Sequence, residues 1–176
     1  MQEFLTDIKT IRERARKQIE DGAVTESYHA DREKVIAVLN EVLATEIVCT
    51  LRYKRHYYTA EGIHSEAVKA EFLEHAKEEQ SHADAVAARI TQLNGEPDFN
   101  PAGLVARSHA EYSAGESIVE MLQENLVAER IAIETYSEIV RWLGDKDVTT
   151  RRLIEEILEK EEEHADDLSS LLARMK

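Results

Sequence analysis

The chain contains one cysteine, two prolines and six glycines among its 176 residues. Because Cys49 is the only cysteine, the sequence excludes an intramolecular disulfide framework and a cysteine-rich zinc site. No stretch approaches the roughly 20 consecutive apolar residues that a membrane-spanning helix needs. The N-terminus also has no apolar run of signal-peptide length. We therefore expect a cytoplasmic protein that does not associate with membranes.

Basic residues are scarce relative to acidic ones. The 36 aspartates and glutamates outnumber the 22 lysines and arginines, which gives a formal net charge of −14. A surface with this charge repels nucleic-acid phosphates and attracts cations. The local exception is the basic run Arg12–Lys17, which is short, contains Glu13 and is typical of a solvated helix face. We therefore expect no DNA binding.

Helix-forming residues, chiefly alanine, glutamate, leucine, arginine and lysine, dominate the composition. The prolines and most glycines fall between long stretches that have helical periodicity, and no alternating strand pattern of useful length appears. We predict a single all-α domain, with an N-terminal helical extension over residues 1–30 and a four-helix bundle over 31–176. A long crossover should join the second bundle helix to the third. The four predicted helices span residues 31–60, 64–94, 115–143 and 146–175.

Each predicted helix carries an apolar stripe with steps of three and four residues, as a bundle helix does. Near its middle, each stripe is interrupted by a glutamate. Burying an ionised carboxylate is very unfavourable unless its charge is compensated, and carboxylates placed close together raise one another's pKa. The interruptions therefore need a common explanation, and they are Glu46, Glu79, Glu129 and Glu161.

The turns between the helices place these glutamates at one height in the bundle. Gly62 marks the first turn and lies almost midway in sequence between Glu46 and Glu79. Gly144 marks the last turn and lies almost midway between Glu129 and Glu161. Residues equidistant from a tight turn sit side by side in two antiparallel helices, so each helical hairpin should bring its two glutamates together.

In two of the four helices a histidine follows the glutamate, as Glu79-x-x-His82 and Glu161-x-x-His164. Residues three apart project from one helix face and can reach one metal cluster. The pattern alone is weak, because Glu-x-x-His occurs four times in the chain, but only these two matches coincide with the stripes and the turns. Two divalent cations would neutralise four carboxylates, and mixed oxygen and nitrogen ligands suit iron or manganese better than calcium or magnesium.

The helix order Glu, Glu-x-x-His, Glu, Glu-x-x-His resembles the ferritin-like di-metal carboxylate proteins, and within them bacterioferritin. The resemblance covers all four helices. It implies two iron ions per subunit, with manganese as the alternative, and the two glutamates that precede histidines would bridge the ions. Tyr53, two turns after Glu46, resembles the tyrosine near the bacterioferritin centre. The resemblance implies a hydrogen-bond partner of the ligands or a radical-forming residue, and the alternative is an ordinary core aromatic. Each remaining ligand pair would hold one ion, namely Glu46 with His82 and Glu129 with His164.

Two departures from bacterioferritin change these expectations. Bacterioferritin binds haem through a methionine just after the bridging glutamate of its second helix; Gln80 stands there, so we expect no haem. The segment from His164 to Lys176 is enough to finish the fourth helix but too short for the additional fifth helix of 24-subunit ferritins. The long N-terminal extension and crossover look more like the 12-subunit shells of the DNA-protecting mini-ferritins (Dps). Typical mini-ferritins, however, place their site between subunits, whereas this ligand set lies within one bundle.

The resemblance implies a ferroxidase that oxidises Fe(II) with O2 or H2O2 and deposits Fe(III) in a homo-oligomeric shell, preferably of 12 subunits, with a role against oxidative stress. Another di-metal oxidoreductase with the same ligand order, such as a manganese catalase or a hydroxylase, is the alternative, and a DNA-coating shell is a third interpretation.

Two further residues stay open at this point. His75 is either a metal ligand near the entrance or inner surface, or a polar residue at the bundle edge. Cys49 either touches the metal or is a small buried hydrophobic residue.

Overall fold

The computed structural model describes residues 6–62 and 65–175. Residues 1–5, 63–64 and 176, which include the first residues of the predicted extension and position 64 of the second predicted helix, lie outside the described residues. The prediction of an all-α fold is confirmed, since the described residues contain helices and no strand. No described helix is long and apolar enough to cross a membrane. The long helices are α2 (Arg32–Thr59), α3 (Ser65–Gln92), α5 (Ile118–Leu143) and α6 (Val148–Arg174).

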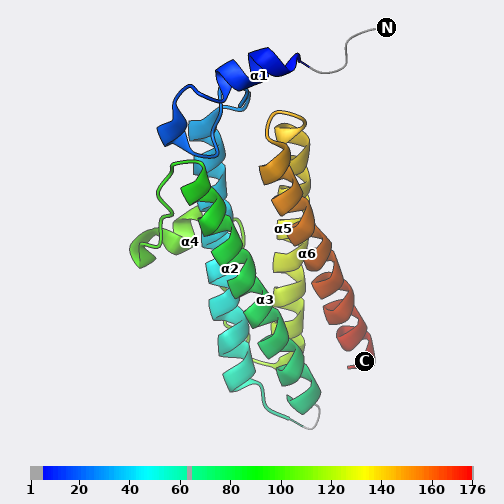
Figure 1. The fold of residues 1–176 in the computed structure, drawn as a ribbon. Coiled ribbons are helices and arrows are strands. Elements are labelled where there is room, and N and C mark those ends of the chain that lie inside the picture. Colours follow the sequence, from blue (N-terminus) through cyan, green and yellow to red (C-terminus); the bar gives the residue numbers. More distant parts are fainter. Residues whose placement is uncertain (1–5, 63–64, 176) are drawn as a thin grey trace, which may run out of the picture.

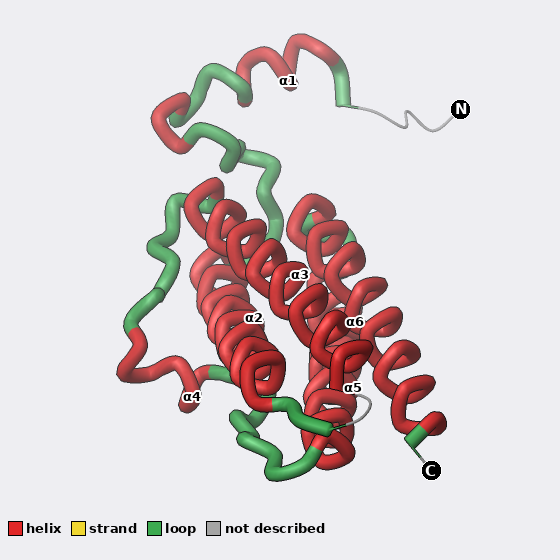
Figure 2. Tube along the Cα trace, turned by 90° about the horizontal axis from the view of Figure 1, so that it is seen from below, coloured by secondary structure: helices red, strands yellow, loops and turns green. Residues whose placement is uncertain are grey.

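The four long helices form two antiparallel hairpins, α2 with α3 and α5 with α6, that pack against each other (Figure 1). Helices α3 and α5 run in the same direction, so the chain between them returns along the whole bundle, as the predicted long crossover requires (Figure 1). Figure 2 shows this connection passing outside the bundle on the α2 side, while the extension that precedes α2 lies beyond one end of the bundle. The short elements are α1 (Ile8–Arg14), η1 (Ile19–Asp21), η2 (Pro101–Gly103) and α4 (Leu104–Arg107).

Helix ends are fixed by residues that satisfy free backbone groups. The side chains of Asp31, Ser117 and Asp147 each accept a hydrogen bond from a backbone N–H in the first turn of α2, α5 and α6. Such caps contribute about 1 kcal/mol each. Gly144 ends α5 with a φ of 50°, a left-handed conformation that glycine adopts without strain. These signals explain why the predicted helix limits lie close to the observed ones.

The core consists of two apolar clusters, one toward each end of the bundle. One contains Leu39, Leu43, Ile90 and Ile154, and the other contains Phe72, Leu122 and Leu168. Burying each such large side chain contributes about 1.5–3 kcal/mol. The glutamates at positions 46, 79, 129 and 161 lie between the two clusters along every helix. Apolar layers therefore close the polar level of the bundle at both ends.

Polar contacts hold the crossover along α2, and residues later in the crossover contact residues later in α2. Asn40 Nδ2 donates to the carbonyl of Glu96 at 3.2 Å, and the N–H of His109 donates to Thr45 Oγ1 at 2.9 Å. Farther along α2, Arg52 donates to the carbonyl of Glu111 at 2.8 Å.

Arg52 is fully buried, although an arginine needs several acceptors to leave water. Besides the crossover carbonyl, its Nε donates to Asn125 Oδ1 on α5 at 2.8 Å. The amide of Asn125 donates in turn to Nδ1 of His56 at 2.9 Å, and Nε2 of His56 lies 2.9 Å from the carbonyl of Ala114. Burial, followed by the charge of Arg52, lowers the pKa of His56 to about 4, so this imidazole is neutral. The chain of bonds fixes the crossover against both hairpins.

A second buried network joins the extension to the start of α6. Asp147 caps α6 and pairs with the guanidinium of Arg89 at 2.9 Å. The hydroxyl of Tyr28, in the extension, donates to the same carboxylate at 2.8 Å. Although burial opposes the shift, hydrogen bonds from Thr150 lower the pKa of Asp147 below its ordinary value of 3.8. The stabilisation from ionised Asp147 is therefore complete above about pH 4 and is lost as the pH falls through the lowered pKa.

Candidate metal centre

Four glutamates, one from each long helix, lie at the polar level between the two apolar clusters. Each carboxyl-bearing side chain is buried, with an exposed fraction of 1%. The distances from the turns had predicted this convergence, and the structure brings all six predicted ligands together. The residues form two groups, each with one histidine: Glu46, Glu79, His82 and Glu161 in the first, and Glu79, Glu129, Glu161 and His164 in the second.

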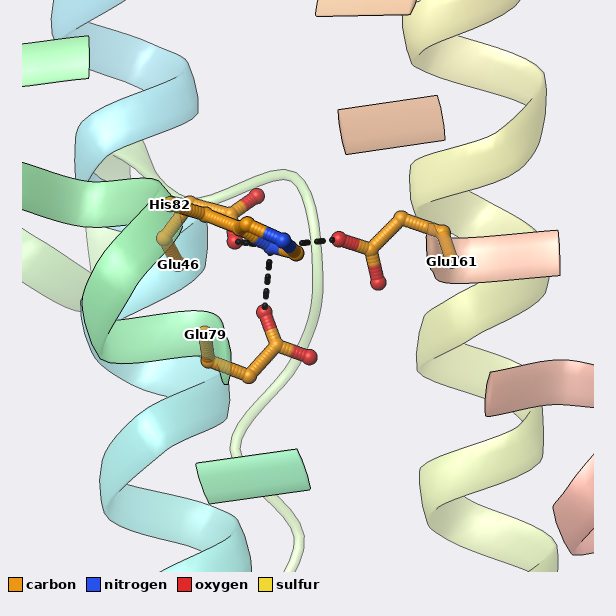
Figure 3. Close-up of side chains that lie close together, drawn as sticks. All are labelled: Glu46, Glu79, His82 and Glu161. Carbon is orange, nitrogen blue, oxygen red and sulfur yellow. Dashed lines mark hydrogen bonds and ion pairs between the residues drawn. The ribbon is translucent and has the colours of Figure 1, made fainter. Parts of the chain in front are cut away.

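His82 is the centre of the first group. Its Nδ1 lies 3.1 Å from an oxygen of Glu161, 3.2 Å from one of Glu46 and 3.9 Å from one of Glu79. Figure 3 shows the three carboxylates reaching the same ring nitrogen from different helices. Two ligand atoms on one cation with bonds of about 2.0–2.2 Å are separated by about 3.0–4.2 Å. The observed spacings therefore suit a single cation.

His164 occupies the corresponding place in the second group. Its Nδ1 lies 3.5 Å from Glu79 Oε1, 3.5 Å from Glu161 Oε2 and 3.9 Å from Glu129 Oε2. Glu79 and Glu161 turn their other oxygens, Oε2 and Oε1, toward His82. Each of these two carboxylates thus faces both histidines with different oxygens, which is the arrangement that a ligand bridging two cations requires.

Several polar atoms of the centre have no well-aligned hydrogen bond, although an imidazole or a carboxylate lies 3.1–3.9 Å away. Buried polar groups in proteins are nearly always paired, so a cluster of unpaired atoms calls for a compensating ion. These atoms all belong to the two ligand groups, and all are of types that bind transition metals. The chemistry of the donor set therefore fits two divalent cations; the unpaired atoms are Glu79 Oε1, Glu129 Oε2, Glu161 Oε1 and His164 Nδ1.

The metal-free centre divides its carboxyl groups into two kinds. Burial, then the charges of Glu79 and Glu161, raise the pKa of Glu46 and of Glu129 well above the ordinary value. Burial would also raise the pKa of Glu79 and Glu161, but hydrogen bonds with the two histidines outweigh it and lower both values. Relative to an ordinary glutamate, Glu46 and Glu129 therefore favour the neutral form, and Glu79 and Glu161 favour the ionised form.

Both histidines of the metal-free centre are protonated. Burial alone would lower their pKa values, but hydrogen bonds with the carboxylates dominate. Bonds with Glu161 and Glu46 raise the pKa of His82 to about 12, and bonds with Glu161 and Glu79 raise that of His164 to about 12. In this form, two imidazolium ions offset two carboxylates of the centre.

Two tyrosines each bind one glutamate of the opposite hairpin. The hydroxyl of Tyr53 on α2 donates to Oε1 of Glu129 on α5, and the hydroxyl of Tyr136 on α5 donates to Oε1 of Glu46 on α2. In each glutamate the other oxygen, Oε2, is the atom nearest a histidine of the centre. Each tyrosine therefore occupies one carboxylate oxygen and aims the second at the centre.

The outer nitrogen of His164 also has a fixed partner. Its Nε2 lies 2.7 Å from an oxygen of Glu78 on α3. A carboxylate there holds the proton on Nε2, which leaves the Nδ1 lone pair free for a cation once the ring is neutral.

Comparison with known proteins identifies the family. The ferritin-like domain family matches residues 36–176, which is most of the chain. The chain belongs to the ferritin-like family.

Ferritin-like relatives of two kinds are similar to the chain. A bacterioferritin from Desulfovibrio desulfuricans is 30% identical over 132 residues, covering 74% of this chain and 70% of the relative. A DNA protection during starvation protein from Pyrococcus furiosus is 33% identical over 146 residues, covering 81% and 78%. Among solved structures, the dodecameric thioferritin of Bacteroides fragilis, a bacterioferritin-related protein, has a TM-score of 0.80 at 34% identity, covering 84% of this chain and 89% of that one.

Sequence reasoning missed Tyr136 and Glu78 in this ferritin-like centre. Tyr136 follows Glu129 at the same spacing at which Tyr53 follows Glu46, and this repetition was a signal that could have revealed it. Cys49 is buried beside small alanines, and its sulfur accepts from Arg52 at 3.5 Å. Cys49 belongs to none of the ligand groups among the described residues, as the hydrophobic interpretation expects.

Proposed function

We propose that the protein is a ferroxidase and iron-storage protein whose di-iron centre lies within one subunit. Glu79 and Glu161 would bridge the two iron ions, and the remaining ligands would be Glu46 with His82 and Glu129 with His164. The observation that supports this most directly is the pair of carboxylates whose two oxygens face different histidines. The ferritin-like family and the bacterioferritin relatives support iron as the metal.

The chemistry requires two electrons from two Fe(II) ions. With H2O2 as oxidant, those electrons and two protons break the O–O bond and give two waters; with O2, they give H2O2. The residues of this chain hold the substrate ions next to each other and exclude bulk water, because apolar clusters close the centre at both ends. Tyr53 and Tyr136 orient the terminal carboxylates by donating to one oxygen of each. Four carboxylates balance the charge of two Fe(II) ions, which limits the cost of burying these ions. Two Fe(III) ions carry two more positive charges than the carboxylates balance, and this excess favours the departure of Fe(III).

The net charge of −14 supports storage, because acidic surfaces draw in Fe(II) and provide carboxylates for mineral nucleation. We propose a homo-oligomeric shell, with 12 subunits in preference to 24. The dodecameric relative supports this number. Consumption of Fe(II) together with peroxide would limit hydroxyl-radical formation and so protect against oxidative stress.

The first test adds Fe(II) aerobically to metal-free protein and measures the iron per subunit that elutes with it by size exclusion. Many iron ions per subunit on a large particle are expected. Two or fewer on a small oligomer would refute storage and favour the other di-metal oxidoreductases.

A double variant tests the site itself. Glu129→Ala combined with His164→Ala should abolish rapid iron oxidation and leave the helical circular dichroism intact, whereas the exposed pair Glu138→Ala and Glu162→Ala should change neither. Oxidation at the wild-type rate in the first variant would refute the assignment.

We do not extend the proposal to DNA binding, despite the DNA-protection relative. The basic run over residues 12–17 is exposed, but Lys17 is paired with Glu26 at 2.9 Å and the chain as a whole is strongly acidic. A gel shift at low salt should show no retardation; retardation that fades with added salt would contradict this expectation.

A further inference from the structure

A third group of metal-binding side chains lies between α3 and α6, outside the di-iron ligand set. Nε2 of His75 lies 3.3 Å from an oxygen of Glu71 and 3.9 Å from an oxygen of Asp167. One ligand atom of each residue lies within 4.8 Å of the others. The two separations from His75 fall within the range of about 3.0–4.2 Å expected for two ligands of one cation.

The tautomer of His75 shows why a cation belongs there. The hydroxyl of Tyr53 donates a hydrogen bond to Glu129, so its oxygen is available to accept from Nδ1 of His75, which lies 3.2 Å away, and this bond favours the Nδ1–H tautomer. With the proton on Nδ1, the lone pair of Nε2 faces the two carboxylates. A lone pair cannot donate to a carboxylate, and the His75 side chain itself is buried, with 1% exposure. A positive ion between the three groups resolves this repulsion.

The position of His75 connects the group to the centre and to solvent. Its ring stacks on that of His164, with centroids 3.9 Å apart and an interplanar angle of 21°. On the other side, the Asp167 and Glu71 side chains have exposed fractions of 55% and 29%. The group therefore extends from the surface of the subunit to the back of a proposed iron ligand.

We propose that Glu71, His75 and Asp167 form a third divalent-cation site, at which Fe(II) is held between solvent and the di-iron centre. Three protein ligands leave coordination positions for water, so the ion is exchangeable. Iron as the cargo rests on the proposed function, whereas the cation site itself rests only on these three residues. Of the two roles that the sequence left open for His75, the proposal assigns it the metal ligand and not the polar residue at the bundle edge.

The direct test is an anomalous-scattering experiment on crystals of the assembled, metal-free protein soaked in Zn(II), which does not react with oxygen. We expect a zinc peak bounded by His75, Glu71 and Asp167, in addition to the peaks at the centre. Glu71→Gln combined with Asp167→Asn should remove that peak alone. Both positions are solvent-accessible, so the variant should fold. The matched exposed pair Glu66→Gln and Asp166→Asn should keep every peak.

Absence of the peak in the wild type, or its persistence in the Glu71→Gln/Asp167→Asn variant, would refute the third site. A zinc peak at this site with none at the centre would support the third site and refute the proposed function. Zinc peaks at the centre with none at this site would refute the third site and leave the proposed function intact.

Kinetics test the transit role. The same variant should need a several-fold higher Fe(II) concentration for half-maximal oxidation, with an unchanged maximal rate. An unchanged half-maximal concentration after loss of the zinc peak would refute transit through the site.

Discussion

Loading the proposed di-metal centre with two divalent cations should release about four protons per subunit near pH 7. In the metal-free centre, the pKa values of His82 and His164 are about 12, so both rings must lose a proton before they bind a cation. The raised pKa values of Glu46 and Glu129 mean that these two carboxyls must also lose protons. The four released protons balance the four positive charges that enter, so the net charge of the buried centre does not change.

The sign of the pH dependence follows from this exchange. Because each cation displaces about two protons, its affinity should rise by about 100-fold for each unit of increasing pH, and should fall by the same factor as the pH decreases. This pH dependence of the affinity holds over the pH range in which the two histidines and the two carboxyls with raised pKa values are protonated in the metal-free protein.

The assay is an anaerobic titration of metal-free protein with Zn(II) in weakly buffered solution, with the pH held constant by added base. Calorimetry in two buffers with different ionisation enthalpies gives the same count independently. The Glu71→Gln/Asp167→Asn variant restricts the titration to the centre. Release of only about two protons per subunit would show that the carboxyls are already ionised without metal, and would refute the charge balance derived above.

Four substitutions test other parts of the structure. Asp147→Ala removes a helix cap and leaves the buried guanidinium of Arg89 unpaired, so it should reduce the free energy of unfolding by about 3–5 kcal/mol. The exposed control Asp145→Ala should reduce it by less than about 1 kcal/mol. Equal shifts of the thermal unfolding temperature in the two variants would contradict this expectation. Tyr53→Phe and Tyr136→Phe should each weaken Zn(II) binding in equilibrium dialysis by about 10–100-fold, and unchanged affinity would show that the hydroxyls do not orient the carboxylates. Glu78→Gln should weaken binding in the same range by releasing the outer nitrogen of His164, and its effect should vanish in a His164→Ala background.

The helices could be predicted from the sequence because their limits depend on local chemistry. The fourth helix, for example, was predicted over 146–175 and spans Val148–Arg174. Asp147 caps it, and a glycine ends the helix before it. The common height of the four glutamates was also predictable, since it depends only on distance from a turn within each hairpin.

The contacts between hairpins could not be predicted in this way. Tyr136 lies on an apolar stripe and looks like an ordinary core residue; its role depends on Glu46, which is distant in the chain and belongs to the other hairpin. Glu78 looks like one more surface acid until α6 brings His164 against it. Arg52 can be buried because a carbonyl of the irregular crossover and the side-chain oxygen of Asn125 accept hydrogen bonds from it. Helical periodicity carries no information about how separate segments dock.

The crossed tyrosines make each helical hairpin one half of a repeated design. Each hairpin carries a glutamate, a tyrosine two turns later and a Glu-x-x-His pair, yet the tyrosine serves the glutamate of the other hairpin. An isolated hairpin would leave its own glutamate unsupported. Two copies of the segment 31–94, paired about a twofold axis, would supply the six ligands and both tyrosines again. The centre is therefore a property of the pairing of two hairpins, and neither hairpin completes it alone.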